Sequence, residues 1–247
     1  MTRTQVLHGE FWVRALGTRV TRFSERSELA LLNCAEGDWV DVSAEMESLL
    51  REALRAYELS AGLVNAAVLP SMLAIGYTRS LAAGASTARL EDARPAPRLT
   101  DVLTVRPGRA RLELGCGLDL GGIAKGWMAD RLAPRLGSNA LANVGGDLRA
   151  IGAGPNGDGW PVGFAGVTVM LRDQGAATSS VRRRRWGDLH HLIDPRTGLP
   201  SQSGLEEVSV VAATGCDAEV VAKTALLLGP GLATAFCAAH AQAWWLG

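Results

Sequence analysis

The sequence lacks the features that mark several common classes of protein. Its four cysteines form no C-x-x-C pair, which argues against a zinc ribbon and a thioredoxin-like motif. No run of about 20 apolar residues is present, so we expect no membrane-spanning helix. Lysine plus arginine and aspartate plus glutamate each total 25, and the resulting net charge of zero argues against a dedicated nucleic-acid or membrane-surface binder.

The N-terminal residues lack the signs of export. The stretch MTRTQVLHGEFWVRALGT has no apolar h-region and no lipid-attachment cysteine. We therefore predict a cytoplasmic protein with reduced thiols.

The most informative stretch is GCGLDLGGIAKGWMAD, residues 115–130. Asp119 stands before the glycine pair Gly121–Gly122, and Lys125 follows in the first turn of an expected helix. Glycines allow close backbone approach to a ligand, a helix N-terminus favours an anion, and lysine adds positive charge. The stretch is neither a Rossmann fingerprint, because Leu120 replaces the last glycine, nor a P-loop. Two interpretations stay open here: a site for a phosphate-bearing ligand, with or without a metal, and a strand-to-helix turn that needs glycine for packing.

A second block, LANVGGDLRAIG at residues 141–152, predicts two strands around a glycine pair. On these residues alone we interpret Asp147 as a residue that closes the turn at a β-bulge.

A third block, HHLIDPRTGLP at residues 190–200, follows four consecutive arginines at 182–185. The arginines are typical of a solvated strand or loop, and the alternative is that one of them reaches an adenylate phosphate or an acidic partner. His191 could accept a hydroxyl proton, since the unperturbed pKa of histidine is about 6.5. The alternative is a histidine bonded to the Asp-Pro turn. His190 would point the other way if both lie on a strand.

Hydrophobic spacing and turn residues predict the remaining elements. We expect a strand and turn at 11–18, a short helix within 22–33 capped by Ser27, a helix from Ser43 to Gly62, a surface loop at 81–98, two strands within 103–115, a helix from Lys125 to Gly137, an edge strand at 160–164, a buried strand followed by a helix capped by Asp217 within 207–230, and an edge formed by Trp244 and Trp245.

The motifs DLGGIAKG with W-x-A-D, NVGGD and HLIDPRTG, in this order, resemble the FAD:protein FMN transferases, the ApbE family. The resemblance covers residues 22–247. It implies an α+β fold of mostly antiparallel sheets covered by helices in two interlocked halves, which is T-fold-like. We expect one such domain over 1–247, with a shortened N-terminal strand-helix unit and a C-terminus that stops early.

The resemblance also implies a site for FAD and Mg²⁺. His191 would be the catalytic base. The implied flavin contacts are Leu63, Val64, Asn65 (where the family has aspartate), Asp119, Lys125 and Ile193.

The family binds Mg²⁺ through Asp-x-x-x-Thr on one helix. Thr224 matches this pattern, but Val220 stands at the aspartate position. Asp217, two turns before Thr224 on a similar face, or Glu219, which is closer in sequence but turned aside from that face, could substitute, Asp217 with less strain. Alternatively, Thr224, a backbone carbonyl near Gly122 and the phosphates of the ligand would bind the ion weakly. From the residues alone, the Thr224 hydroxyl could instead bond a carbonyl one turn back.

The implied activity is transfer of FMN from FAD to a Ser or Thr hydroxyl of an acceptor flavoprotein subunit, with release of AMP. Three alternatives stay open. The chain could be a Mg²⁺-dependent FAD pyrophosphatase, an FAD-binding relative without transferase activity, or a relative that has lost the ligand.

Overall fold

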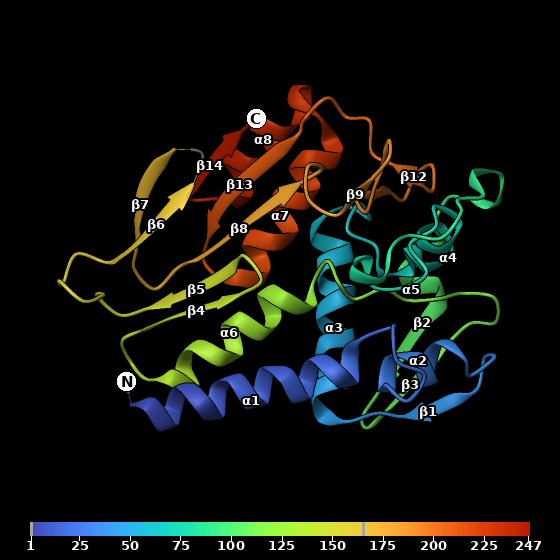
Figure 1. Ribbon diagram of the computed structural model, residues 1–247, viewed down its shortest axis with the longest axis horizontal. Coiled ribbons are helices and arrows are strands. Elements are labelled where there is room, and N and C mark those ends of the chain that lie inside the picture. Colours follow the sequence, from blue (N-terminus) through green and yellow to red (C-terminus); the bar gives the residue numbers. More distant parts are fainter. Residues whose placement is uncertain (1, 165) are drawn as a thin grey trace. The chain divides into compact units, whose positions relative to one another are not determined.

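The computed structural model describes residues 2–164 and 166–247, which divide into two compact units. Unit 1 comprises the residues up to Leu16, Ile123–Ser180 and Ser203–Gly247, and unit 2 comprises Gly17–Gly122 and Val181–Gln202. Helices and antiparallel sheets occur in both units (Figure 1). Among the described helices, none combines the length and hydropathy needed to cross a membrane.

Eight α-helices are assigned in the described residues. They are α1 (Arg3–Val20), α2 (Glu28–Asn33), α3 (Ala44–Leu59), α4 (Leu69–Ala74), α5 (Leu99–Val102), α6 (Ala124–Leu136), α7 (Gly215–Leu228) and α8 (Pro230–His240). Short 3₁₀ helices occur at Ala66–Val68, Leu81–Ala83 and Leu90–Asp92.

The strands pair in an antiparallel sense throughout. Unit 1 holds a five-stranded sheet in the order β14-β13-β8-β5-β4, made of β4 (Ala140–Val144), β5 (Asp147–Ile151), β8 (Gly175–Ser180), β13 (Glu207–Ala212) and β14 (Ala243–Leu246), and the pair β6 (Trp160–Phe164) and β7 (Val167–Leu171). Unit 2 holds a sheet in the order β1-β3-β2, made of β1 (Trp39–Asp41), β2 (Leu103–Arg106) and β3 (Arg109–Leu112), and the pairs β9 (Arg185–Trp186) with β10 (Leu189–His190) and β11 (Ile193–Asp194) with β12 (Leu199–Pro200).

The core of unit 1 lies between the five-stranded sheet and the helices α6 and α7 (Figure 1). Glycine permits the two helices to approach each other closely. A Cβ added at Gly126 of α6 would lie 2.7 Å from the carbonyl oxygen of Gly215, at the start of α7. The two N-terminal turns are therefore held at a distance that no larger residue allows.

The core of unit 2 uses one face of α3, as the apolar spacing predicts. Met46, Leu49 and Leu50 are fully buried, and the Ser43 hydroxyl accepts the Met46 N–H at the helix start. A second apolar group in this unit joins Ile75 and Tyr77 to neighbouring residues of α4 and β11.

The helix α1 corrects the strand that we expected at 11–18. In unit 1 the side chains of Trp12 and Val13 pack on the α6 cluster around Leu132. A helix presents both to one partner, so tertiary packing overrides the local β preference of this apolar run. Gly9 leaves room for the contact, since a Cβ there would lie 2.8 Å from Leu132.

The other local predictions are largely confirmed. Ser27 and Ser43 cap α2 and α3, Gly137 follows the last residue of α6, and β14 forms an edge of its sheet. The segment 141–152 forms a hairpin in which Gly145 and Gly146 are the two loop residues and both adopt positive φ. The β-bulge that we expected in this segment is therefore replaced by a two-residue turn. Thr214, and not Asp217, is the N-cap of α7.

We expect Gly126→Ala to lower the free energy of unfolding by about 1–3 kcal/mol, because the new methyl group overpacks the contact with α7. Gly17→Ala is the matched control. Gly17 lies in α1 with no atom within 4 Å of an added Cβ, so alanine should raise stability by up to about 1 kcal/mol. Urea unfolding measures both values, and equal effects of the two substitutions would contradict the close approach.

Candidate functional site

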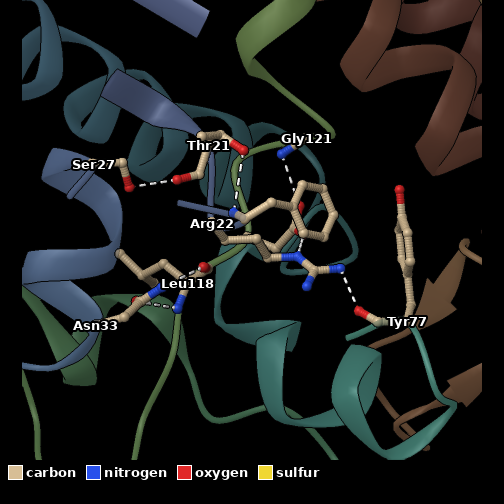
Figure 2. A network of polar contacts seen from close by, with 9 residues as sticks. Thr21, Arg22, Ser27, Asn33, Tyr77, Leu118 and Gly121 are labelled. Atoms are coloured by element: carbon tan, nitrogen blue, oxygen red, sulfur yellow. Dashed lines mark hydrogen bonds and ion pairs between the residues drawn. The ribbon is translucent and has the colours of Figure 1, made fainter. Parts of the chain in front are cut away.

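Asp119 is held by a buried network in unit 2 (Figure 2). The Arg22 Nε donates to Asp119 Oδ2 at 2.5 Å, and the Gly121 N–H donates to Asp119 Oδ1 at 2.8 Å. The second donor of Arg22, Nη2, binds the Tyr77 carbonyl at 2.6 Å. The Arg22 side chain is only 5% exposed, and its guanidinium lies 4.2 Å from the Phe23 ring centroid. The carboxylate is therefore fixed in position and paired with a desolvated cation.

The segment that contains α2 positions the backbone next to Asp119. The Asn33 amide makes two hydrogen bonds with Leu118, donating to its carbonyl at 3.0 Å and accepting its N–H at 2.8 Å. Ser27 starts the same helix and donates to the Thr21 carbonyl (Figure 2). The helix that we predicted at 22–33 therefore orders both Arg22 and the chain that leads into Asp119.

The loop with the predicted flavin contacts lies beside Asp119 in the same unit. The Asp119 N–H donates to the Ala66 carbonyl at 2.8 Å. Leu63 and Val64 are buried. Asn65 uses its side chain internally, since Oδ1 accepts the Ala67 N–H at 2.9 Å and Nδ2 donates to the Pro97 carbonyl at 2.8 Å.

His191 follows β10 directly and is half-buried. Its neighbour His190 is fixed, because its Nε2 lies 3.0 Å from the Ser201 carbonyl and its Nδ1 accepts the Leu192 N–H at 3.3 Å. Burial lowers the pKa of His190, which agrees with a neutral ring that accepts at Nδ1 and donates from Nε2. Ile193 is buried in the apolar group of α4.

Unit 1 contains a second buried network, around Lys125. The Lys125 ammonium contacts the carboxylate of Asp147 and lies 3.0 Å from Glu219 Oε1. The other Glu219 oxygen accepts the Gly126 N–H at 2.9 Å. Both carboxylates are almost completely buried. We call Lys125, Asp147 and Glu219 the charge triad.

Electrostatics differ between the two carboxylates of the charge triad. Burial and then the neighbouring Glu219 raise the pKa of Asp147 to about 7. Burial also opposes ionisation of Glu219, but Lys125 and Lys223 hold its pKa below the usual value. We infer that Glu219 is ionised near neutral pH and that Asp147 is protonated in part of the molecules.

The charge triad bears on two predictions. Asp147 does more than close a turn, since it is a buried partner of Lys125. Glu219, the other candidate replacement for the metal-binding aspartate, is directed by α7 to Lys125 and the N-terminus of α6. Neither contact is visible in local spacing, because the Lys125 and Glu219 positions are 94 residues apart in the sequence.

The residues predicted to bind Mg²⁺ do not fit one ion. The Thr224 hydroxyl donates to the Val220 carbonyl at 2.7 Å, and Asp217 accepts the Thr214 hydroxyl at 2.7 Å. Seven residues of α-helix rise by about 10 Å, whereas two oxygens bound to one Mg²⁺ lie at most about 4.2 Å apart. Gly122 belongs to unit 2. No group of three or more His, Cys, Asp or Glu with metal-binding geometry occurs in the described part of the chain.

Asp130, the last residue of the W-x-A-D segment, has a role that the sequence did not reveal. Its two carboxylate oxygens accept the N–H groups of Gly215 at 2.7 Å and Cys216 at 2.9 Å. These are the first N–H groups of α7, and an anion at this position stabilises a helix. Asp130 therefore ties α6 to the start of α7.

Comparison with known proteins places these motifs in a family. The model of the ApbE family matches residues 5–245. The chain is 29% identical to the FAD:protein FMN transferase of Treponema pallidum over 236 residues, which cover 82% of this chain and 65% of the relative. It is 23% identical to the protein of the same name from Haemophilus influenzae over 251 residues, covering 88% of this chain and 70% of the relative. The chain thus spans just under two-thirds of the Treponema protein.

Solved structures agree in fold. The ApbE protein of Thermotoga maritima superposes with a TM-score of 0.81 at 24% identity, covering 92% of this chain and 79% of that chain. The apo flavinyl transferase ApbE of Pseudomonas stutzeri gives a TM-score of 0.82 at 21% identity, covering 96% and 79%. The molecule is therefore an α+β protein with the fold of these transferases. Together with the match to the family model, this shows that the chain belongs to the ApbE family.

The contact between Asp119 and FAD that we propose below predicts that Arg22→Gln weakens FAD binding by about tenfold, since loss of one charge-assisted hydrogen-bonded pair frees the Asp119 carboxylate. Arg26→Gln is the control, because Arg26 is an exposed arginine of the same segment. Quenching of flavin fluorescence on titration with protein measures both affinities. Unchanged affinity of the Arg22 variant, with a folded protein, would contradict a positioning role for this arginine.

Proposed function

We propose that this chain transfers FMN from FAD to a Ser or Thr hydroxyl of an acceptor protein and releases AMP. One observation carries the proposal. In unit 2, three sequence segments meet at Asp119: the Arg22–Asn33 segment, the 63–65 loop and the DLGG turn. The names of the curated relatives support the same activity. A cytoplasmic location remains a prediction.

The described residues suggest how FAD would be held. We assign flavin contacts to the loop of Leu63, Val64 and Asn65, to Ile193 and to Asp119. Lys125 receives a positioning role, because its ammonium already contacts Asp147 and Glu219. Its charge holds the N-terminus of α6 in place and is not available in full to a phosphate.

The reaction is a displacement at phosphorus. The acceptor hydroxyl oxygen forms a bond to the FMN phosphorus, the bond from that phosphorus to the bridging oxygen breaks, and AMP leaves with that oxygen. His191 takes the hydroxyl proton as the reaction proceeds, a role that suits a histidine near neutral pH. Magnesium dependence remains a prediction of the family resemblance.

A flavin-binding relative without transferase activity is the second candidate. Val220 replaces a metal-binding aspartate, and the Thr224 hydroxyl is bonded within its own helix. This candidate predicts FAD binding that is insensitive to Mg²⁺. An FAD pyrophosphatase would instead use water as the acceptor and release FMN with AMP.

The assay for the proposal is AMP release from FAD by the purified chain, with Mg²⁺ or EDTA, and with or without a Thr-containing peptide. We expect AMP release that increases with the peptide, together with flavin bound covalently to it. Release without peptide dependence would indicate the pyrophosphatase, and FAD binding without AMP release would contradict the transferase.

We expect His191→Ala to reduce transfer by at least about a hundredfold, the usual contribution of a general base, and to leave FAD affinity unchanged. His8→Ala is the control, because His8 is exposed on α1. Equal transfer rates of the two variants would remove His191 as the base.

A further inference from the structure

Four consecutive arginines, Arg182–Arg185, precede β10 and the candidate base in unit 2, and all four are exposed. We call them the arginine loop. Arg185 lies 3.8 Å from Asp188. Arg183 and Arg184 form no ion pair and no side-chain hydrogen bond with any described residue. The protein as a whole has equal numbers of basic and acidic residues, so the four arginines are a local concentration of positive charge.

The backbone displays these side chains at a conformational cost. Arg184 has a φ of 50°, in the left-handed region. That conformation costs an ordinary L-residue about 1–2 kcal/mol. Such a residue is kept where the surroundings determine the conformation, and strained residues of this kind cluster at functional sites.

The base of the arginine loop is rigid. Trp186 of β9 donates through Nε1 to the Ile75 carbonyl at 3.0 Å, and its ring lies 5.4 Å from the Tyr77 ring. On β10, His190 is fixed by the Ser201 carbonyl. The loop therefore presents its arginines from an anchored hairpin of two short strands.

The hairpin also places the arginines beside the candidate base. Arg185 pairs with His190 across the β9–β10 ladder, and paired residues have Cβ atoms about 5 Å apart. The next residues outward on the two chains are Arg184 and His191. Whatever binds the loop would thus lie close to His191.

We propose that the arginine loop docks an acidic segment of the acceptor protein and so brings its hydroxyl to His191. This inference rests on the proposed transferase function. Guanidinium groups bind carboxylates in a bidentate manner. An exposed pair contributes only about 0–1 kcal/mol, so a segment with several carboxylates suits the loop better than a single phosphate does. Its charge would also speed the encounter.

The test uses the full-length chain and two labelled peptides, one with a threonine flanked by glutamates and one with glutamines in their place. Fluorescence anisotropy measures binding at low and at high ionic strength. The double variant Arg183→Gln/Arg184→Gln is compared with Arg89→Gln/Arg172→Gln, which removes the same charge from exposed positions elsewhere.

We expect the unmodified chain to bind the acidic peptide in preference to the neutral one, with affinity that falls as salt rises. The arginine-loop variant should bind it at least about tenfold more weakly, and the control should bind as the unmodified chain does. The KM for FAD should be equal in all three proteins.

Equal peptide affinities in the two double variants would overturn the docking proposal while leaving the transferase assay unaffected. A raised KM for FAD in the loop variant, with unchanged peptide affinity, would also overturn it, because the arginines would then serve the nucleotide. Loop-dependent peptide binding without any AMP release would retain the docking surface and reject the proposed function.

Discussion

The charge triad is the constraint on which unit 1 depends most. One ammonium, from Lys125, lies against two buried carboxylates that come from β5 and α7. Removing the cation would take from the buried Glu219 and Asp147 their direct ion-pair partner, which is far more costly than breaking a surface ion pair. Glu219 of the triad also accepts the backbone N–H of Gly126 in α6. Asp130, four residues further along α6, accepts the N–H of Gly215 at the start of α7. Lys125 and Asp147 belong to motifs that suggest a ligand site, but their first role is to balance buried charge within this unit.

Unit 2 also contains a buried charged network, in which a cation holds a carboxylate of the motif. There a carboxylate, Asp119, is held by a buried guanidinium, and Asn33 fixes the backbone beside it through two hydrogen bonds. The cost of burying Arg22 is offset by its carboxylate partner, the Tyr77 carbonyl and the Phe23 ring. This arrangement prepares the DLGG turn before any ligand binds, and preorganisation reduces the entropy lost on binding. The family motifs therefore describe two rigid charged networks, one in each unit.

Much of this could be predicted from the sequence, and the failures share one cause. The motif order indicated the family, and local signals gave α3 and the two strands within 103–115, because capping residues and apolar spacing act over a few positions. The strand expected at 11–18 was wrong, since contacts with α6 decide its conformation. The ion pairs of Arg22 with Asp119 and of Glu219 with Lys125 were missed because the partners lie 97 and 94 residues apart in the sequence. Asp217 and Thr224 were predicted to bind Mg²⁺ from the resemblance to the family, but seven residues of α-helix separate their positions by about 10 Å along the axis.

Lys125 acts mainly as the ion-pair partner of Asp147 and Glu219 and not as a ligand for the nucleotide. The direct measurement is urea unfolding of Lys125→Met at neutral pH, together with its dissociation constant for FAD. We predict a loss of roughly 3–5 kcal/mol of unfolding free energy, as expected when a buried ion pair loses one partner. Unchanged stability with a weakened affinity for FAD would contradict the account, because Lys125 would then act mainly as a ligand for the nucleotide.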